Sequence, residues 1–127
     1  MAISQKSLEL AIDAIAGIEN VKMDANSLAE DVYLTSCAFN EELEFKKAIS
    51  ETVRALRQIT QGKITPACLK YAFEGWSSYH YQHSRTQKTR ADMRIVFKVV
   101  SVEVYVLGFG HRNTPSDIYF RLAAGRL

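Results

Sequence analysis

Two stretches rich in β-branched and aromatic residues, separated by a very short connection, constrain the fold of this chain most strongly. Residues 93–100 read MRIVFKVV and residues 102–109 read VEVYVLGF. This composition favours β-strands. A connection as short as the one around Ser101 joins antiparallel neighbours, because parallel strands need a long crossover. The sequence therefore predicts an antiparallel strand pair in the C-terminal half.

Apolar residues at helical spacing dominate the N-terminal half. They predict a helix over residues 4–19, with Ser4 as its N-cap. They also predict a helix over residues 40–61, with Asn40 as N-cap, glutamates at the positive end of the helix dipole and a glycine just beyond its end. The segment from 20 to 26 reads as a connector.

Residues 28–39 fit two interpretations. Leu28 and Val32 lie one helical turn apart and favour a helix. Alternate residues from 33 to 39 would share one face of a strand. The alternation favours a strand over residues 31–38, and the helix stays open as the alternative.

The segments before the strand pair carry turn and strand signals. A Thr-Pro pair predicts a short helix over residues 65–74, since proline is favoured at the first helical position. Residues 79–84 alternate and predict a strand. One face of that strand would carry Tyr79, Tyr81 and His83, and the other would carry His80, Gln82 and Ser84.

The end of the chain completes a small α+β domain. Residues 85–92 form a polar loop, residues 110–115 a turn, and residues 116–124 a short closing helix or turn. The length of 127 residues suits one domain. We expect N-terminal helices followed by a small twisted antiparallel sheet.

Charge is divided unevenly along the chain, although its net value is only +2. Residues 1–62 hold six basic and ten acidic residues, a net charge of −4, and residues 63–127 hold ten basic and four acidic residues, a net charge of +6. A basic surface attracts phosphate backbones whatever their sequence. The alternative is that the arginines only solvate one face of the sheet.

The two cysteines, Cys37 and Cys68, have no metal-ligand or disulfide spacing. They are interpreted as small buried apolar residues, which fits a reducing, cytoplasmic compartment. No apolar run is long enough to cross a membrane, and no secretory signal is visible. No metal and no cofactor are expected.

The C-terminal half combines basic and aromatic side chains in a way that suits RNA. Guanidinium groups hold phosphates through paired hydrogen bonds, and aromatic rings stack on unpaired bases. The candidates for contact with RNA are Arg85, Arg90, His83, Lys98, His111 and Arg121. Glycine-rich phosphate loops and the common hydrolase motifs are absent from the sequence.

Three further residues, Arg94, Arg112 and Tyr119, could act on a phosphate. Arg94 lies in an otherwise apolar strand, so its charge needs a partner, either a ligand phosphate or one of Glu74, Asp92 and Asp117. His111 and Arg112 follow the end of a strand, where functional groups often lie. Tyr119 follows a few residues later. The alternatives are a structural role for His111 and a place in the core for Tyr119.

The stretch from 85 to 121 resembles the C-terminal core of the RelE/ParE superfamily of bacterial toxins. The segments that carry the resemblance are MRIVFKV, VYVLGFGHR and DIYFR. They match a strand containing an arginine, a second strand ending in His-Arg, and a tyrosine a few residues later. The resemblance covers residues 31–124, so residues 1–30 form an additional helical segment before a core over residues 31–127.

The resemblance implies a toxin of a toxin–antitoxin module that cuts mRNA without a metal, usually on the ribosome. The 2′-hydroxyl attacks the neighbouring phosphate and leaves a cyclic phosphate. Arg94 would contact the phosphate, Arg112 would stabilise the transition state and Tyr119 would orient or deprotonate the nucleotide. Lys88, or His83, would supply a further charge or proton. The expected partners are an antitoxin protein, mRNA and the ribosome.

Departures from the family leave a second interpretation open. The family usually begins at its first strand, whereas about 30 residues precede that strand here. The chain could instead bind a protein target such as gyrase, or act as an interaction module. A stripe containing Leu8, Ile12 and Ile15 could pair with a second copy and form a homodimer through the N-terminal helix.

Overall fold

The computed structural model describes residues 2–86 and 89–127. The helices are α1 (Gln5–Ala16), α2 (Ala25–Ala38), α3 (Glu42–Thr60) and α4 (Ile118–Arg126), with a 3₁₀ turn, η1, at Tyr71–Phe73. The strands are β1 (Val21–Met23), β2 (Ala67–Cys68), β3 (Ser77–Tyr81), β4 (Met93–Val100) and β5 (Glu103–His111). The fold is therefore α+β, as expected.

The strands form one sheet in the order β1-β5-β4-β3-β2. The predicted antiparallel pair is confirmed, since β4 and β5 pair antiparallel around a tight turn that contains Ser101. The expectation of a purely antiparallel sheet is wrong, because β1 pairs parallel to β5 with Val21 opposite Val104. The expected connector at residues 20–26 contains this strand.

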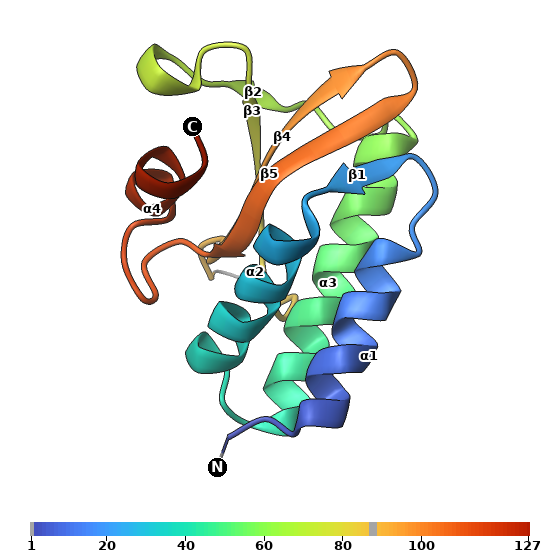
Figure 1. Cartoon of the computed structure of the whole chain (residues 1–127), viewed down its shortest axis with the longest axis vertical. Coiled ribbons are helices and arrows are strands. Elements are labelled where there is room, and N and C mark those ends of the chain that lie inside the picture. The colour runs from blue at the N-terminus through green and yellow to red at the C-terminus, as the bar shows by residue number, and fades with distance from the viewer. Residues whose placement is uncertain (1, 87–88) are drawn as a thin grey trace.

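Helices cover both faces of the sheet (Figure 1). On one face, α1, α2 and α3 enclose the main core, to which β4 contributes Met93, Ile95 and Phe97. On the other face, α4 packs Ile118 and Leu122 against the sheet in a smaller cluster. Alternate residues of β4 point to opposite faces, so the strand is buried on both sides along its first half.

Helix α2 corrects the strand predicted over residues 31–38. Asp24 caps its N-terminus by accepting a hydrogen bond from the Ser27 N–H at 3.0 Å. The buried residues of α2 are Leu28, Asp31, Val32, Thr35 and Ser36, which recur at helical spacing. The alternation that favoured a strand therefore has no structural role. The boundary expected between residues 30 and 31 also falls inside α2.

Other predicted elements are partly confirmed. Ser4 caps α1 as expected, accepting from the Ser7 N–H at 3.1 Å. The N-cap of α3 is Glu41 rather than Asn40, and it makes no side-chain capping bond. The helix predicted over residues 65–74 is wrong, since that segment forms β2 and η1. Both cysteines are exposed, so their interpretation as buried residues is also wrong.

A buried carboxylate joins α4 to α2 and β5. Asp31 is fully buried and accepts hydrogen bonds from three directions. The donors are the Phe109 N–H at 2.9 Å, Nη1 of Arg121 at 2.8 Å, and Nη1 and Nη2 of Arg126, both at 2.7 Å. Burial by itself lowers the pKa of Arg126, because it disfavours the charged guanidinium. The hydrogen bonds to Asp31 and its negative charge act in the opposite direction, and the pKa of Arg126 is raised overall. We name this group the Asp31 cluster.

Gly108 allows α4 to lie close to β5. A Cβ atom at this position would stand 2.3 Å from Cδ2 of Leu122 and 2.7 Å from Nη1 of Arg126. Both distances are shorter than atoms can approach without displacement. The absent side chain therefore sets the distance between the helix and the strand.

Substitution of Asp31 tests how strongly the cluster supports the fold. Asp31→Ala leaves two largely buried guanidinium groups and one backbone N–H without their acceptor. We expect the free energy of unfolding to fall by about 3–5 kcal/mol in urea denaturation. Glu30→Ala is the control, because this side chain is 57% exposed and should cost less than about 1 kcal/mol. Equal losses would contradict the role of the cluster.

Substitution of Gly108 tests the packing of α4 on the sheet. Gly108→Ala should destabilise the chain by about 1–3 kcal/mol, because the added methyl group collides with Leu122 and Arg126. Gly125→Ala adds a methyl group to α4 in open space, and it should stabilise the helix by up to about 1 kcal/mol. Thermal unfolding followed by circular dichroism measures both. A neutral Gly108→Ala would contradict the close packing.

Candidate functional site

Several polar side chains share the sheet face on which α4 lies. In the register, His80 of β3 stands opposite Arg94 of β4, and Arg94 stands opposite Gly110 of β5. Directly opposed residues of antiparallel strands project to the same face. Ser78 lies two residues before His80 and therefore joins them. The sequence had placed His80 on the face opposite Tyr79 and Tyr81, and the strand confirms this.

Tyr119 of α4 contacts this polar group directly. Its hydroxyl lies 2.8 Å from Oγ of Ser78 and 3.3 Å from Nε2 of His80. The ring packs edge-on against Phe73 with centroids 5.9 Å apart. The phenol is therefore held over β3, 39 residues from His80 in the sequence. We name Ser78, His80, Arg94 and Tyr119 the α4-face site.

Arg94 is 9% exposed, and its guanidinium contacts carbonyl oxygens rather than the carboxylates weighed as partners. Its Nη1 donates to the carbonyl oxygens of Ala91 and Met93, both at 2.9 Å. No ion pair joins it to a carboxylate within residues 2–86 and 89–127. Carbonyl groups carry only partial charge, so these two acceptors do not neutralise the positive charge of Arg94.

Arg112 lies where β5 ends and the chain turns towards α4. Its backbone N–H donates to the carbonyl of Asp92 at 2.9 Å, and its carbonyl accepts from the Ile118 N–H at 2.9 Å. Its Nε atom is buried without a hydrogen-bond partner in the described part of the chain. Buried polar atoms of this kind usually have partners, so this guanidinium contains one unsatisfied donor.

The environment of His80 favours its neutral form. Burial lowers the pKa of His80, and the positive charge of Arg94 lowers it further. A neutral imidazole has one nitrogen that accepts a proton. His80 is therefore suited to act as a base near neutral pH.

A polar hollow of ≈ 340 Å³ opens beside the site at the edge of β3. Its walls include His80, Gln82, Arg54 and Arg85, and they also include Glu51. Arg85 stands 3.8 Å from Glu51 in an exposed ion pair, which contributes little to stability. Arg54 and Arg85 therefore share the lining of this hollow with His80.

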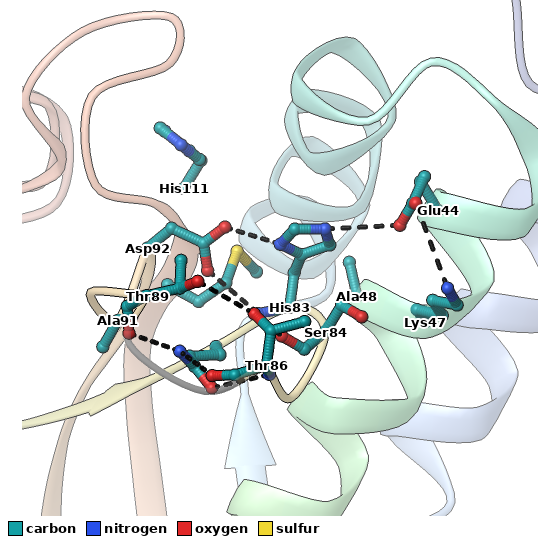
Figure 2. Close-up of polar contacts among 12 residues, drawn as sticks. Glu44, Lys47, Ala48, His83, Ser84, Thr86, Thr89, Ala91, Asp92 and His111 are labelled. Atoms are coloured by element: carbon teal, nitrogen blue, oxygen red, sulfur yellow. Dashed lines mark hydrogen bonds and ion pairs between the residues drawn. The ribbon is translucent and has the colours of Figure 1, made fainter.

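His83, predicted for proton transfer or RNA contact, lies between two carboxylates (Figure 2). Its Nδ1 is 2.5 Å from Oδ2 of Asp92, and its Nε2 is 3.3 Å from Oε2 of Glu44. The ring stacks on Phe39 with centroids 4.2 Å apart. These contacts join the loop after β3 to α3, away from the α4-face site.

His111 has the structural role that was weighed for it. Its Nδ1 accepts from the N–H groups of Asn113 and Thr114, both at 3.1 Å. Burial lowers the pKa of His111, although Asp92 opposes this shift. The ring therefore holds the turn that follows β5.

The remaining predicted residues are dispersed. Arg85 and Arg90 are exposed in the loop, and Lys98 lies over the ring of Trp76 at 4.7 Å. Arg121 belongs to the Asp31 cluster, with Nη1 2.8 Å from the carboxylate. Lys88 lies outside the described residues. The structure thus brings Arg94 and Tyr119 near His80 and Ser78, two residues that the sequence analysis had not included in the site.

Within the described residues, no group of histidine, cysteine and carboxylate side chains could hold a metal ion. No described helix is both long and apolar enough to cross a bilayer. Comparison of the chain with protein-family models, curated proteins and solved structures gives no match.

The titration of His80 tests the electrostatics of the site. Because burial and Arg94 both disfavour the imidazolium, we expect NMR titration to give a pKa below about 6.5, the ordinary histidine value. Arg94→Gln should raise the pKa of His80 only part of the way to the ordinary value, because burial still lowers it. Arg112→Gln is the control, because Arg112 acts on His111. A His80 pKa above the ordinary value would contradict the arrangement.

Proposed function

We propose that this chain is a metal-independent endoribonuclease of the RelE/ParE type, a toxin that cuts mRNA on the ribosome and is neutralised by an antitoxin protein. The observation that carries the proposal is the contact of the Tyr119 hydroxyl with His80, which stands opposite Arg94 on the next strand. A base, a phenol and an uncompensated cation thereby share one face of the sheet.

The proposed reaction uses these groups in defined roles. Neutral His80 accepts the proton of the 2′-hydroxyl, and Tyr119 orients the nucleotide through its hydroxyl. The 2′-oxygen attacks phosphorus while the bond from phosphorus to the 5′-oxygen breaks. The products are a 2′,3′-cyclic phosphate and a 5′-hydroxyl, which takes its proton from water or from Lys88.

The guanidinium groups supply charge stabilisation. Negative charge grows on the phosphoryl oxygens in the transition state, and positioned cations lower its energy. Arg94 has no carboxylate partner among the described residues, and Arg112 keeps a buried Nε donor without an acceptor. We propose that a substrate phosphate binds the terminal nitrogens of these two guanidinium groups.

The α+β topology is compatible with the resemblance to the toxin family. Helices α2 and α3 precede the antiparallel strands that carry the resembling segments. The additional N-terminal segment contributes Ile15 and Ile18 to the main core. The apolar stripe of Leu8, Ile12 and Ile15, which had suggested a homodimer, therefore packs within the same chain. For this reason we do not propose a homodimer through α1.

Cleavage of mRNA in a ribosome-containing translation mixture tests the proposal. The buffer is first treated with EDTA to remove transition metals, and magnesium is then added back for the ribosome. In this buffer the wild-type chain should cut a short mRNA. Mass spectrometry should identify cyclic phosphate ends on the products. His80→Ala and Tyr119→Phe should each lower the cleavage rate, by about 10²-fold or more for loss of the base. Arg112→Ala should also lower it.

Tyr105→Phe is the matched control, because this tyrosine is partly exposed and its hydroxyl donates to Oε1 of Glu103 at 3.2 Å, outside the α4-face site. It should cleave at the wild-type rate. Unfolding temperatures of all variants separate loss of fold from loss of chemistry. Absence of cleavage by the wild-type chain, or full activity of His80→Ala, would refute the proposed reaction.

A further inference from the structure

A groove follows the junction of α1 and α3, which lie side by side on one flank of the molecule (Figure 1). Two hollows of ≈ 560 and ≈ 390 Å³ share Ala14, Lys46 and Ile49 in their walls. Because they share these residues, they form one continuous depression. We name it the α1–α3 groove.

The floor of the groove is apolar. Leu10 and Ala14 line it from α1, and Ile49 and Val53 line it from α3. Leu10 is 58% exposed although its neighbours on the helix reach the core. An exposed apolar strip with a polar border is typical of a surface that binds another protein.

The border of the groove is basic. Its charged lining residues are Lys6, Lys46, Arg54, Arg57 and Lys63, and no described Asp or Glu lines either hollow. None of these five side chains forms an ion pair with a carboxylate in the part of the chain that the structure describes. Glu42, near Lys46, accepts instead from Ser4 and Ser7.

The groove gathers five cations without an ion-pair partner among the described residues, although the charge of Lys46 helps to lower the pKa of Glu42. Arg121 and Arg126 are neutralised by the Asp31 cluster, and Lys22 and Arg85 have carboxylate partners. The groove cations come mainly from the half of the sequence with net negative charge. Folding therefore creates a basic surface that the net charges of residues 1–62 and 63–127 do not predict.

We propose that the α1–α3 groove binds an acidic amphipathic helix of a partner protein. Carboxylates on such a helix would meet the basic border, and its apolar face would cover the floor. A nucleic acid backbone would offer phosphates but no apolar stripe for the floor. From Lys46 to Gln61 the groove spans about 22 Å at the helical rise of 1.5 Å per residue, which accommodates about four turns.

This inference stands apart from the proposed cleavage reaction. Among the groove cations, Arg54 alone also lines the hollow beside His80, so it is left unchanged in the test. Fluorescence anisotropy with three labelled peptides of equal length provides the measurement. The first carries leucines at helical spacing with glutamates elsewhere, the second replaces the glutamates by lysines, and the third replaces the leucines by glutamines.

The first peptide should bind the full chain saturably, and the other two should bind about tenfold more weakly or not at all. Lys46→Glu combined with Arg57→Glu should weaken binding of the first peptide by about tenfold or more. Lys47→Glu combined with Lys70→Glu makes the same change in net charge outside the groove and should leave affinity within about twofold. Circular dichroism confirms that both variants fold.

Four outcomes would overturn the proposal. The first is no saturable binding of the glutamate-leucine peptide up to about 1 mM, the weak limit of specific affinity. The second is an equal loss of binding in both double variants, which would indicate attraction by net charge alone. The third is binding of a single-stranded oligoribonucleotide, but not of the peptide, through Lys46 and Arg57. The fourth is a dimer in light scattering that the groove variant abolishes, which would make a second copy the occupant.

Discussion

The buried carboxylate of Asp31 organises the molecule, because it unites three elements that are distant in sequence. It accepts hydrogen bonds from a backbone N–H of β5 and from two guanidinium groups of α4, and it lies inside α2. A charge in such surroundings is tolerated only when its hydrogen bonds are complete. The position of α4 follows from these bonds and from the space at Gly108, and Tyr119 is carried with it to β3.

The sequence predicted the elements whose signals are local. Strand β4 was predicted over its full length, and α3 to within two residues at its start and one at its end. Residues 31–38 were misread because alternate residues from 33 to 39 resemble one face of a strand, whereas the structure buries residues at helical spacing. Strand β1 has three residues, too few for a periodic signal, and it forms because β5 offers a partner. Such tertiary pairing overrides local preference.

The candidate site was predicted only in part, for a similar reason. Arg94 and Tyr119 could be named from their surroundings in the sequence, whereas His80 and Ser78 enter through strand register and the placement of α4. The position of His80 on the face opposite Tyr79 was the available signal. The basic character of the C-terminal half was a weaker guide, because Arg121 serves an internal carboxylate. Composition records charges, but only contacts show which of them remain free to bind.

The exposure of Cys37 and Cys68 has a practical consequence for work in solution. Cys37 lies near the end of α2, and Cys68 lies in β2, the last strand of the sheet. Accessible thiols react with maleimide dyes, so the natural chain already offers two attachment points on separate elements. In air the same thiols can join two molecules through a disulfide. Such a covalent dimer would have the same mass as a non-covalent dimer and could be mistaken for one. Measurements of molecular mass therefore belong in a reducing buffer.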